Sequence, residues 1–185
     1  MPEPAALMWL MQRLSRLIGT ATDSLEQQYP GGAEAWETEV ARQLARYHGA
    51  AMLAGADVAA LTPAMRTAVT RDLAIQLAFL KQFGFAVRSA KQWERGWNAR
   101  AQMYARSIQV PYWQGTTKLL PLPAMPAEGT RCLTNCKCQW EVVTLDGENN
   151  YDAYWRRAAD DSCQTCRQRE LEWSPVRIRG GVLQL

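Results

Sequence analysis

The sequence predicts an α+β protein in which a mainly α-helical N-terminal bundle precedes a small C-terminal β-hairpin module. Three observations support this prediction. Apolar residues recur at helical spacing up to about residue 110, prolines are frequent from residue 111 to residue 126, and all five cysteines fall between residues 132 and 166. We therefore divide the chain into a helical domain (residues 1–110), a proline-rich arm (111–130) and a cysteine-rich module with an extended tail (131–185).

The composition is that of a protein able to bury a core, since 48% of its 185 residues are hydrophobic. The 21 Lys and Arg residues exceed the 18 Asp and Glu residues by only three, which is too little to indicate a nucleic-acid-binding protein by charge alone. No apolar run is long enough to cross a membrane, and no signal peptide is recognised. These features predict that the chain folds in a reducing, intracellular compartment.

Two amphipathic helices are expected first. The apolar residues of the first helix are Leu7, Leu10, Met11, Leu14, Leu17 and Ile18, and those of the second are Trp36, Val40, Leu44, Tyr47 and Ala51. Both sets follow the three- and four-residue steps of a helix face, and residues 29–32 separate them. His48, the only histidine, is expected to be a surface or capping residue.

Two further helices complete the predicted bundle. Thr62 and Pro63 form a strong start signal for the third helix, which is expected to run toward Gly84. Ser89 and Gln92 have the spacing of a capping box for the fourth helix. The stripe of that helix is Trp93, Trp97, Tyr104 and Ile108, and aromatic residues at this spacing are expected in the core. Carboxylates such as Glu37, Glu39 and Asp72 fall at polar helix positions.

The chain beyond residue 110 is expected to be largely extended. Four prolines, namely Pro111, Pro121, Pro123 and Pro126, oppose a regular helix and favour an extended arm. Residues 140–145 and 151–157 have the composition of two strands, and the turn residues 146–150 lie between them. The tail after Trp173 has few apolar residues and is expected to dock on another molecule.

The spacing of the cysteines predicts a structural zinc site, with one ion per chain. Cys136 and Cys138 precede the hairpin, and Cys163 and Cys166 follow it, which is the arrangement of a zinc ribbon. Cys132 is a further candidate ligand and the one most easily left out. Disulfides would leave one of five thiols unpaired, and an iron–sulfur cluster also takes four thiolates, so both remain alternatives.

Motifs of common enzyme active sites are missing from the sequence. It contains no glycine-rich phosphate loop, no Gly-x-Ser-x-Gly elbow and no His-Glu-x-x-His helix. A zinc ion with four thiolate ligands keeps no open position for water or substrate. We therefore expect a protein without enzymatic activity and without catalytic residues.

Three segments resemble the Mu F-like head-morphogenesis (minor head) proteins of tailed bacteriophages. They are Tyr104-Ala-Arg-Ser-Ile108, Tyr112-Trp-Gln-Gly115 and, after the proline arm, Cys132-Leu-Thr-Asn-Cys136-Lys-Cys138-Gln-Trp140. The family carries an Asn-Cys-Arg-Cys signature, which Asn135-Cys136-Lys137-Cys138 matches with lysine for arginine. The resemblance covers about residues 70–140. The family's Trp-x-Thr-x-x-Asp and Arg-x-x-His stretches are absent here, and the pair Cys163 and Cys166 lies beyond the usual signature.

The resemblance implies a virion component that is made in the host cytoplasm and is associated with the portal or inner capsid. Its expected partners are phage head or portal proteins in a multi-copy assembly, and it could contact packaged DNA. Neither a membrane nor a small-molecule substrate is expected. The alternative prediction is a zinc-ribbon protein that either binds nucleic acid or has a regulatory role, and the basic C-terminal segments permit it.

Overall fold

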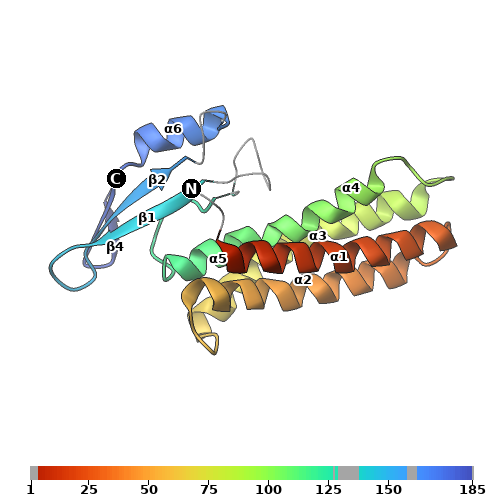
Figure 1. Ribbon diagram of the computed structural model, residues 1–185, viewed down its shortest axis with the longest axis horizontal. Helices are drawn as coiled ribbons and strands as arrows, with labels where there is room; N and C mark the ends of the chain where they lie inside the picture. Colours follow the sequence, from red (N-terminus) through yellow and green to blue (C-terminus); the bar gives the residue numbers. More distant parts are fainter. Residues whose placement is uncertain (1–3, 127, 129–137, 158–161, 185) are drawn as a thin grey trace.

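The computed structural model, which describes residues 4–126, 128, 138–157 and 162–184, shows an α+β protein. A long helical body is followed by a small antiparallel sheet at one end of the molecule (Figure 1). The predicted fold class is therefore confirmed at this level. Within the described residues, no helix combines the length and the apolarity that crossing a membrane requires.

The first two helices of the body are α1 (Ala5–Gln28) and α2 (Ala33–Ala56), as the apolar stripes predict. The predicted stripe residues of α2 are all buried, and so are most of those of α1. The short connection between the helices ends at Gly32, whose φ of 79° is left-handed and suits glycine. Burial of the two stripes against each other and against the remaining helices explains why these segments form stable helices.

The third helix, α3 (Pro63–Ser89), begins as predicted, because the Thr62 side chain accepts a hydrogen bond from the Met65 N–H at 3.3 Å. The helix extends beyond Gly84 to Ser89, so the predicted start of a new helix at Ser89 is wrong. The Tyr29 hydroxyl lies 2.5 Å from the Ala90 carbonyl oxygen and 3.0 Å from that of Val87. This contact satisfies carbonyl groups at the end of α3, and the next helix begins only at Trp97.

The fourth side of the bundle consists of α4 (Trp97–Gln102), the 3₁₀ helix η1 (Met103–Ile108) and α5 (Gln109–Thr116). Pro111 lies in the first turn of α5, where backbone N–H groups have no partner inside the helix, so proline is tolerated there. The prediction that Pro111 begins an extended arm is therefore wrong. The helical body reaches Thr116.

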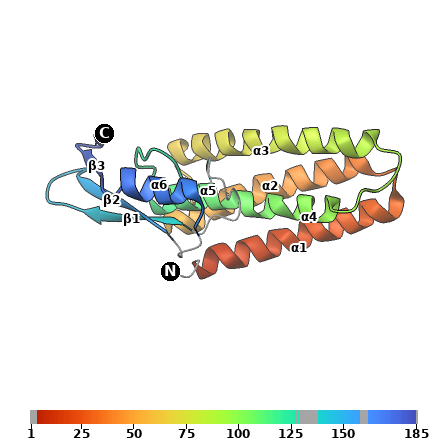
Figure 2. The same cartoon turned by 90° about the horizontal axis from the view of Figure 1, so that it is seen from above.

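Helix α2 is central to the body, because it packs against α1, α3 and α5 (Figure 2). Glycines allow α2 and α5 to approach closely. A Cβ atom on Gly55 would lie 2.9 Å from the Tyr112 carbonyl carbon, and one on Gly115 would lie 2.8 Å from the Ala56 nitrogen. Real side chains avoid such distances, so the backbones of these two helices touch.

Aromatic side chains fill the end of the body far from the sheet. Phe83 is buried, and its ring lies 5.5 Å from that of Trp36, 6.2 Å from that of Trp97 and 6.5 Å from that of Tyr104. The Arg100 guanidinium covers the Phe83 ring at 4.4 Å. The prediction that the aromatic residues of the fourth helical segment belong to the core is confirmed for Trp97 and Tyr104.

The C-terminal module is a four-stranded antiparallel sheet in the order β1-β2-β3-β4, with one helix. Its elements are β1 (Gln139–Thr144), β2 (Tyr151–Arg156), α6 (Gln164–Glu172), β3 (Val176–Arg179) and β4 (Val182–Gln184). The two predicted strands are confirmed, whereas α6, β3 and β4 are not among the predicted elements. The expectation of an extended tail that docks on another molecule is wrong for residues 176–184, because β3 pairs with β2 and β4 pairs with β3 within the same chain.

Three tryptophans form the core of the module. The rings of Trp140 and Trp155 lie 5.2 Å apart, and Trp173 lies 6.1 and 5.8 Å from them. The Arg169 guanidinium lies over Trp155 at 5.3 Å and over Trp173 at 4.7 Å. The indole N–H of Trp140 donates to the Ala124 carbonyl oxygen at 2.8 Å, which attaches the module to the arm.

Candidate functional site

The three described cysteines belong to the segments that begin β1 and α6. Cys138 is buried immediately before β1, Cys163 is the N-cap residue of α6, and Cys166 is buried in its first turn. Gln139 pairs with Arg156 in the sheet, and the chain returns from Arg156 to Cys163 over a short connection. The start of β1 and the start of α6 therefore lie at the same end of the module (Figure 1).

The predicted donor set is compatible with this topology but extends beyond the described residues. Cys163 and Cys166 are three positions apart at a helix start, so both thiols can face the same side of α6. Within the described part of the chain, no three His, Cys, Asp or Glu side chains are grouped closely enough to hold a metal ion. Cys132 and Cys136 lie outside it. A four-thiolate site would need one or both of them beside the three described thiols.

An ion pair holds the segment that carries Cys163. Arg157, just after β2, pairs with Glu170 of α6, and its guanidinium also donates to the Ser162 hydroxyl at 3.4 Å. These contacts fix α6 against the end of β2. The two cysteines of α6 therefore have a defined position relative to the sheet.

The basic residues of the module are largely engaged with neighbouring groups. Arg156 pairs with Glu141 at 2.5 Å, and Arg179 pairs with Asp152 at 2.7 Å. The cation of Arg169 lies between two tryptophan rings, as described above. Arg167 and Arg177 are exposed and make no ion pair with the described residues. The module consequently presents a mixed-charge surface rather than a basic one.

His48 is buried, which contradicts its predicted surface or capping position. Its Nε2 lies 3.0 Å from the Ser107 hydroxyl, which itself donates to the Tyr104 carbonyl oxygen at 2.7 Å. The Ser107 oxygen therefore accepts from Nε2–H, and Nδ1 carries no proton in this neutral tautomer. Within the described residues Nδ1 has no hydrogen-bond partner. Burial lowers the pKa of His48 to about 4.

The pair of His48 and Ser107 fixes η1 on α2 rather than forming an accessible catalytic dyad. Both residues are buried, so a substrate would have to open the bundle to reach the serine hydroxyl. Sequence periodicity contains a signal for the burial of His48, because it follows Leu44 by four residues and precedes Ala51 by three. A histidine on an apolar stripe requires a buried hydrogen-bond partner, and Ser107 provides it.

The carboxylates expected at polar helix positions differ in their environments. Glu39 is half-buried and pairs with Arg42, and Glu37 pairs with Arg88 across the α2 and α3 contact. Asp72 is buried instead, and its burial raises its pKa, which the neighbouring Arg71 opposes. The expectation is therefore wrong for Asp72.

A comparison with known proteins gives no family to which these features can be assigned. Function is therefore inferred from the residues of this chain. No protein-family model, no curated protein and no solved structure matches it.

Proposed function

We propose that this chain is a non-enzymatic structural protein of a tailed-phage particle, in which it acts as a minor head, portal-associated or connector protein. In this role it assists head assembly or DNA delivery through contacts with other proteins. The phage assignment rests on the resemblance of residues 104–140 to minor head proteins. The role in protein contacts rests on the exposed apolar face of α3.

The exposed face of α3 is the observation that carries the proposal. Ile75, Phe79 and Phe85 are 50%, 53% and 68% exposed, although large apolar side chains gain about 1.5–3 kcal/mol each from full burial. Residues 73–80 of the helix carry no charge. Figure 2 places α3 along one outer edge of the body. Ile75 and Phe79 are four positions apart and therefore lie on one face of the helix. Exposed apolar side chains grouped in this way are typical of a protein–protein interface.

A structural zinc ion, held by thiolates at the end of the module, is part of the same proposal. The supporting observation is that the segments carrying Cys138, Cys163 and Cys166 come together at one end of the sheet. Cys136 or Cys132 would complete the set. A four-thiolate zinc site has no free coordination position, so it would fasten β1 to α6 without taking part in a reaction.

The alternative function, nucleic-acid binding by the module, has less support. Proteins that bind nucleic acid present free Lys and Arg to the phosphates, and their affinity falls steeply with salt. Arg156, Arg157 and Arg179 are instead paired with carboxylates of the module.

Incorporation into particles tests the proposal. The variant Ile75→Glu/Phe79→Glu places two charges on the exposed face of α3, and Arg66→Glu on the same helix is the matched control. In cells that produce the particles, we expect the wild type and the control to cosediment with heads or head intermediates on a density gradient. The double variant should remain folded by circular dichroism yet stay in the soluble fraction.

Two results would contradict the proposed function. Particles that assemble fully while the wild-type chain sediments only as a free protein would exclude a structural role. Wild-type levels of the double variant in particles would show that the α3 face is not the contact surface.

A further inference from the structure

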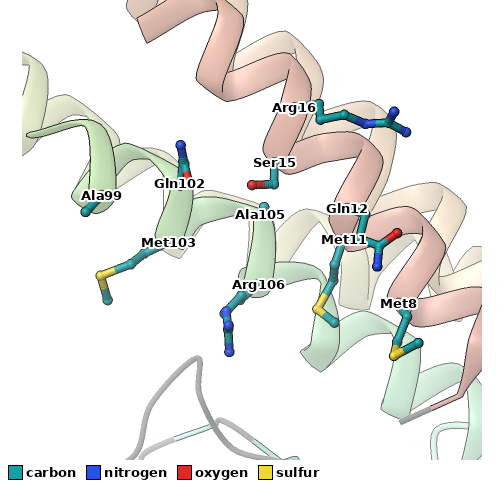
Figure 3. Close-up of a pocket in the computed structure, with 10 residues that line it drawn as sticks. All are labelled: Met8, Met11, Gln12, Ser15, Arg16, Ala99, Gln102, Met103, Ala105 and Arg106. Atoms are coloured by element: carbon teal, nitrogen blue, oxygen red, sulfur yellow. The ribbon is translucent and has the colours of Figure 1, made fainter. Parts of the chain in front are cut away.

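A surface groove with a volume of about 860 Å³ lies along the contact of α1 with the segment formed by α4 and η1 (Figure 3). It is distinct from both the cysteine end of the module and the exposed face of α3. Its walls come from two helical segments that are far apart in the sequence. Its lining residues include Met8, Met11, Arg16, Gln102, Met103 and Arg106.

Three methionines give the groove an adaptable apolar lining. Met8 and Met103 are 40% and 44% exposed and lie on opposite walls. Met11 is positioned by a residue of the core, because the side-chain amide nitrogen of the buried Gln109 lies 3.7 Å from the Met11 sulfur. Methionine side chains are flexible and polarisable, and they are common on surfaces that accept apolar side chains of a partner.

The walls of the groove are positively charged. Arg16 lines the groove on α1 and Arg106 lines it on η1, and none of the lining residues is an Asp or Glu. Arg13 and Arg100 lie over the aromatic rings of Trp9 and Phe83. Arg16 and Arg106 are exposed, one on each wall.

The two wall arginines are available to a partner, because neither forms an ion pair with the part of the chain that the structure describes. Figure 3 shows that they lie on different segments and point in different directions. They are therefore poorly placed to hold one phosphate group between them. The arrangement suits two separate carboxylates on the two sides of a ligand that fills the groove.

We infer that this groove docks an amphipathic helix of a partner protein, with apolar side chains between Met8 and Met103 and acidic side chains against Arg16 and Arg106. Helices that bind in grooves place apolar residues at helical spacing on one face, and their flanks supply the charges that give specificity. The inference deepens the proposed function, on which it rests, by defining the chemistry of the partner surface.

Methionine methyl NMR tests this inference within the full-length chain. The seven methionines include Met52 and Met65, which are buried in the body away from the groove, and Met125 in the arm. The probe is a synthetic amphipathic helical peptide with leucine on one face and glutamate on both flanks. We expect it to shift the methyl signals of Met8, Met11 and Met103 and to leave those of Met52 and Met65 unchanged.

A charge exchange tests the arginines. Arg16→Glu/Arg106→Glu should weaken binding of the glutamate peptide by at least about tenfold, since two favourable ion pairs become repulsive. The same variant should bind a matched peptide with lysine flanks better than the wild type does. Unchanged signals of Met52 and Met65 in the variant would show that it keeps its fold.

Several outcomes would overturn the inference. They are an absence of shifts at millimolar peptide, shifts only at methionines outside the groove, and equal binding of the glutamate and lysine peptides. A duplex oligonucleotide that shifts the groove methyls when the glutamate peptide does not would assign the surface to nucleic acid instead. The assay contains no phage particles, so its failure is distinguishable from failure of the α3 incorporation test.

Discussion

The helical body and the C-terminal module are stabilised by different means. In the body, long helices bury apolar stripes and a cluster of aromatic rings, and one face of each helix contributes to a core that continues to Trp140 and Trp155 of the module. In the module, strands of three to six residues surround three tryptophans, and much of the cohesion comes from specific polar contacts. Small units bury too little surface to be stable on packing alone, so the module depends more on individual links.

The links of the module are identifiable. The Ser174 hydroxyl accepts a hydrogen bond from the backbone N–H of Trp155 at 2.8 Å and lies 3.2 Å from the carbonyl oxygen of the same residue. The Trp140 indole binds the arm, and Arg157 binds α6. Loss of one such link should open the module locally, whereas loss of a core side chain in the body should lower the stability of the whole body.

The largest effect is expected at the aromatic centre of the body. Phe83→Ala removes a buried ring and should lower the free energy of unfolding by about 3–5 kcal/mol. The control Phe79→Ala, on the exposed face of the same helix, should change it by no more than about 0.5 kcal/mol. Chemical denaturation monitored at the helical circular dichroism signal measures both. Similar losses in the two variants would mean that Phe83 is not the centre of this core.

The second effect concerns pH and the buried histidine. His48 has a pKa of about 4 in the folded chain against an ordinary value of 6.5, so the unfolded state binds more protons between these values. The contribution of His48 to the free energy of unfolding is complete above pH 6.5. It declines as the pH falls toward 4, by about 3 kcal/mol in total.

Denaturation of the wild type and of His48→Gln at several pH values between 4 and 7 measures this dependence. The variant should lose most of the slope in that window, and the opposite contribution of Asp72, whose pKa is raised, cancels in the comparison. Parallel curves for the two proteins would show that His48 is not buried in its neutral form.

A third, smaller effect tests the close approach of α2 and α5. Gly55→Ala places a methyl group against the backbone of Tyr112 and should cost about 1–3 kcal/mol. Gly49→Ala is the matched control on α2, because its methyl group would meet only the end of the Leu61 side chain at 3.9 Å. That variant should be neutral or more stable, since alanine favours a helix. An equal change in the free energy of unfolding of the two variants would contradict the close contact between the backbones of α2 and α5.

The smallest effect is expected in the module. Ser174→Ala removes the hydroxyl that binds the Trp155 backbone and should cost about 1 kcal/mol of local stability. Amide hydrogen exchange of β2 should become faster, while exchange in α1 and α2 should stay unchanged. Thr144→Ala, at the exposed end of β1, is the control. An equal increase in exchange throughout the body would argue against separate stability of the two regions.

The sequence predicts the body well because its signals are local and periodic. The stripes of α1 and α2 and the cap at Thr62 depend on neighbouring residues, and the structure contains all three. The end of α3 depends instead on the distant Tyr29 hydroxyl, so a local capping pattern at Ser89 was misleading. Pro111 misled in a similar way, because its position within a helix, rather than its presence, decides whether the helix forms.

The sequence of β3 and β4 does contain a strand signal, but the low number of apolar residues in the tail makes it hard to recognise. Val176 and Ile178 alternate with Arg177 and Arg179, which is a strand pattern, and Gly180 and Gly181 have φ values of 57° and 79° in a two-residue hairpin. The candidate zinc ligands could be predicted from the spacing of the cysteines in the sequence. The structure brings the segments that carry three of them, Cys138, Cys163 and Cys166, to one end of the sheet. Two others, Cys132 and Cys136, lie outside the described residues.

The most direct test of the contrast between body and module is amide hydrogen exchange before and after removal of metal by a strong chelator under reducing conditions. We predict that the protein is purified with about one zinc per chain, as a four-thiolate site requires. After chelation, the amides of β1, β2 and α6 should lose protection, while those of α1, α2 and α3 keep theirs. Unchanged protection of the module, or an equal loss in the helical body, would contradict the account.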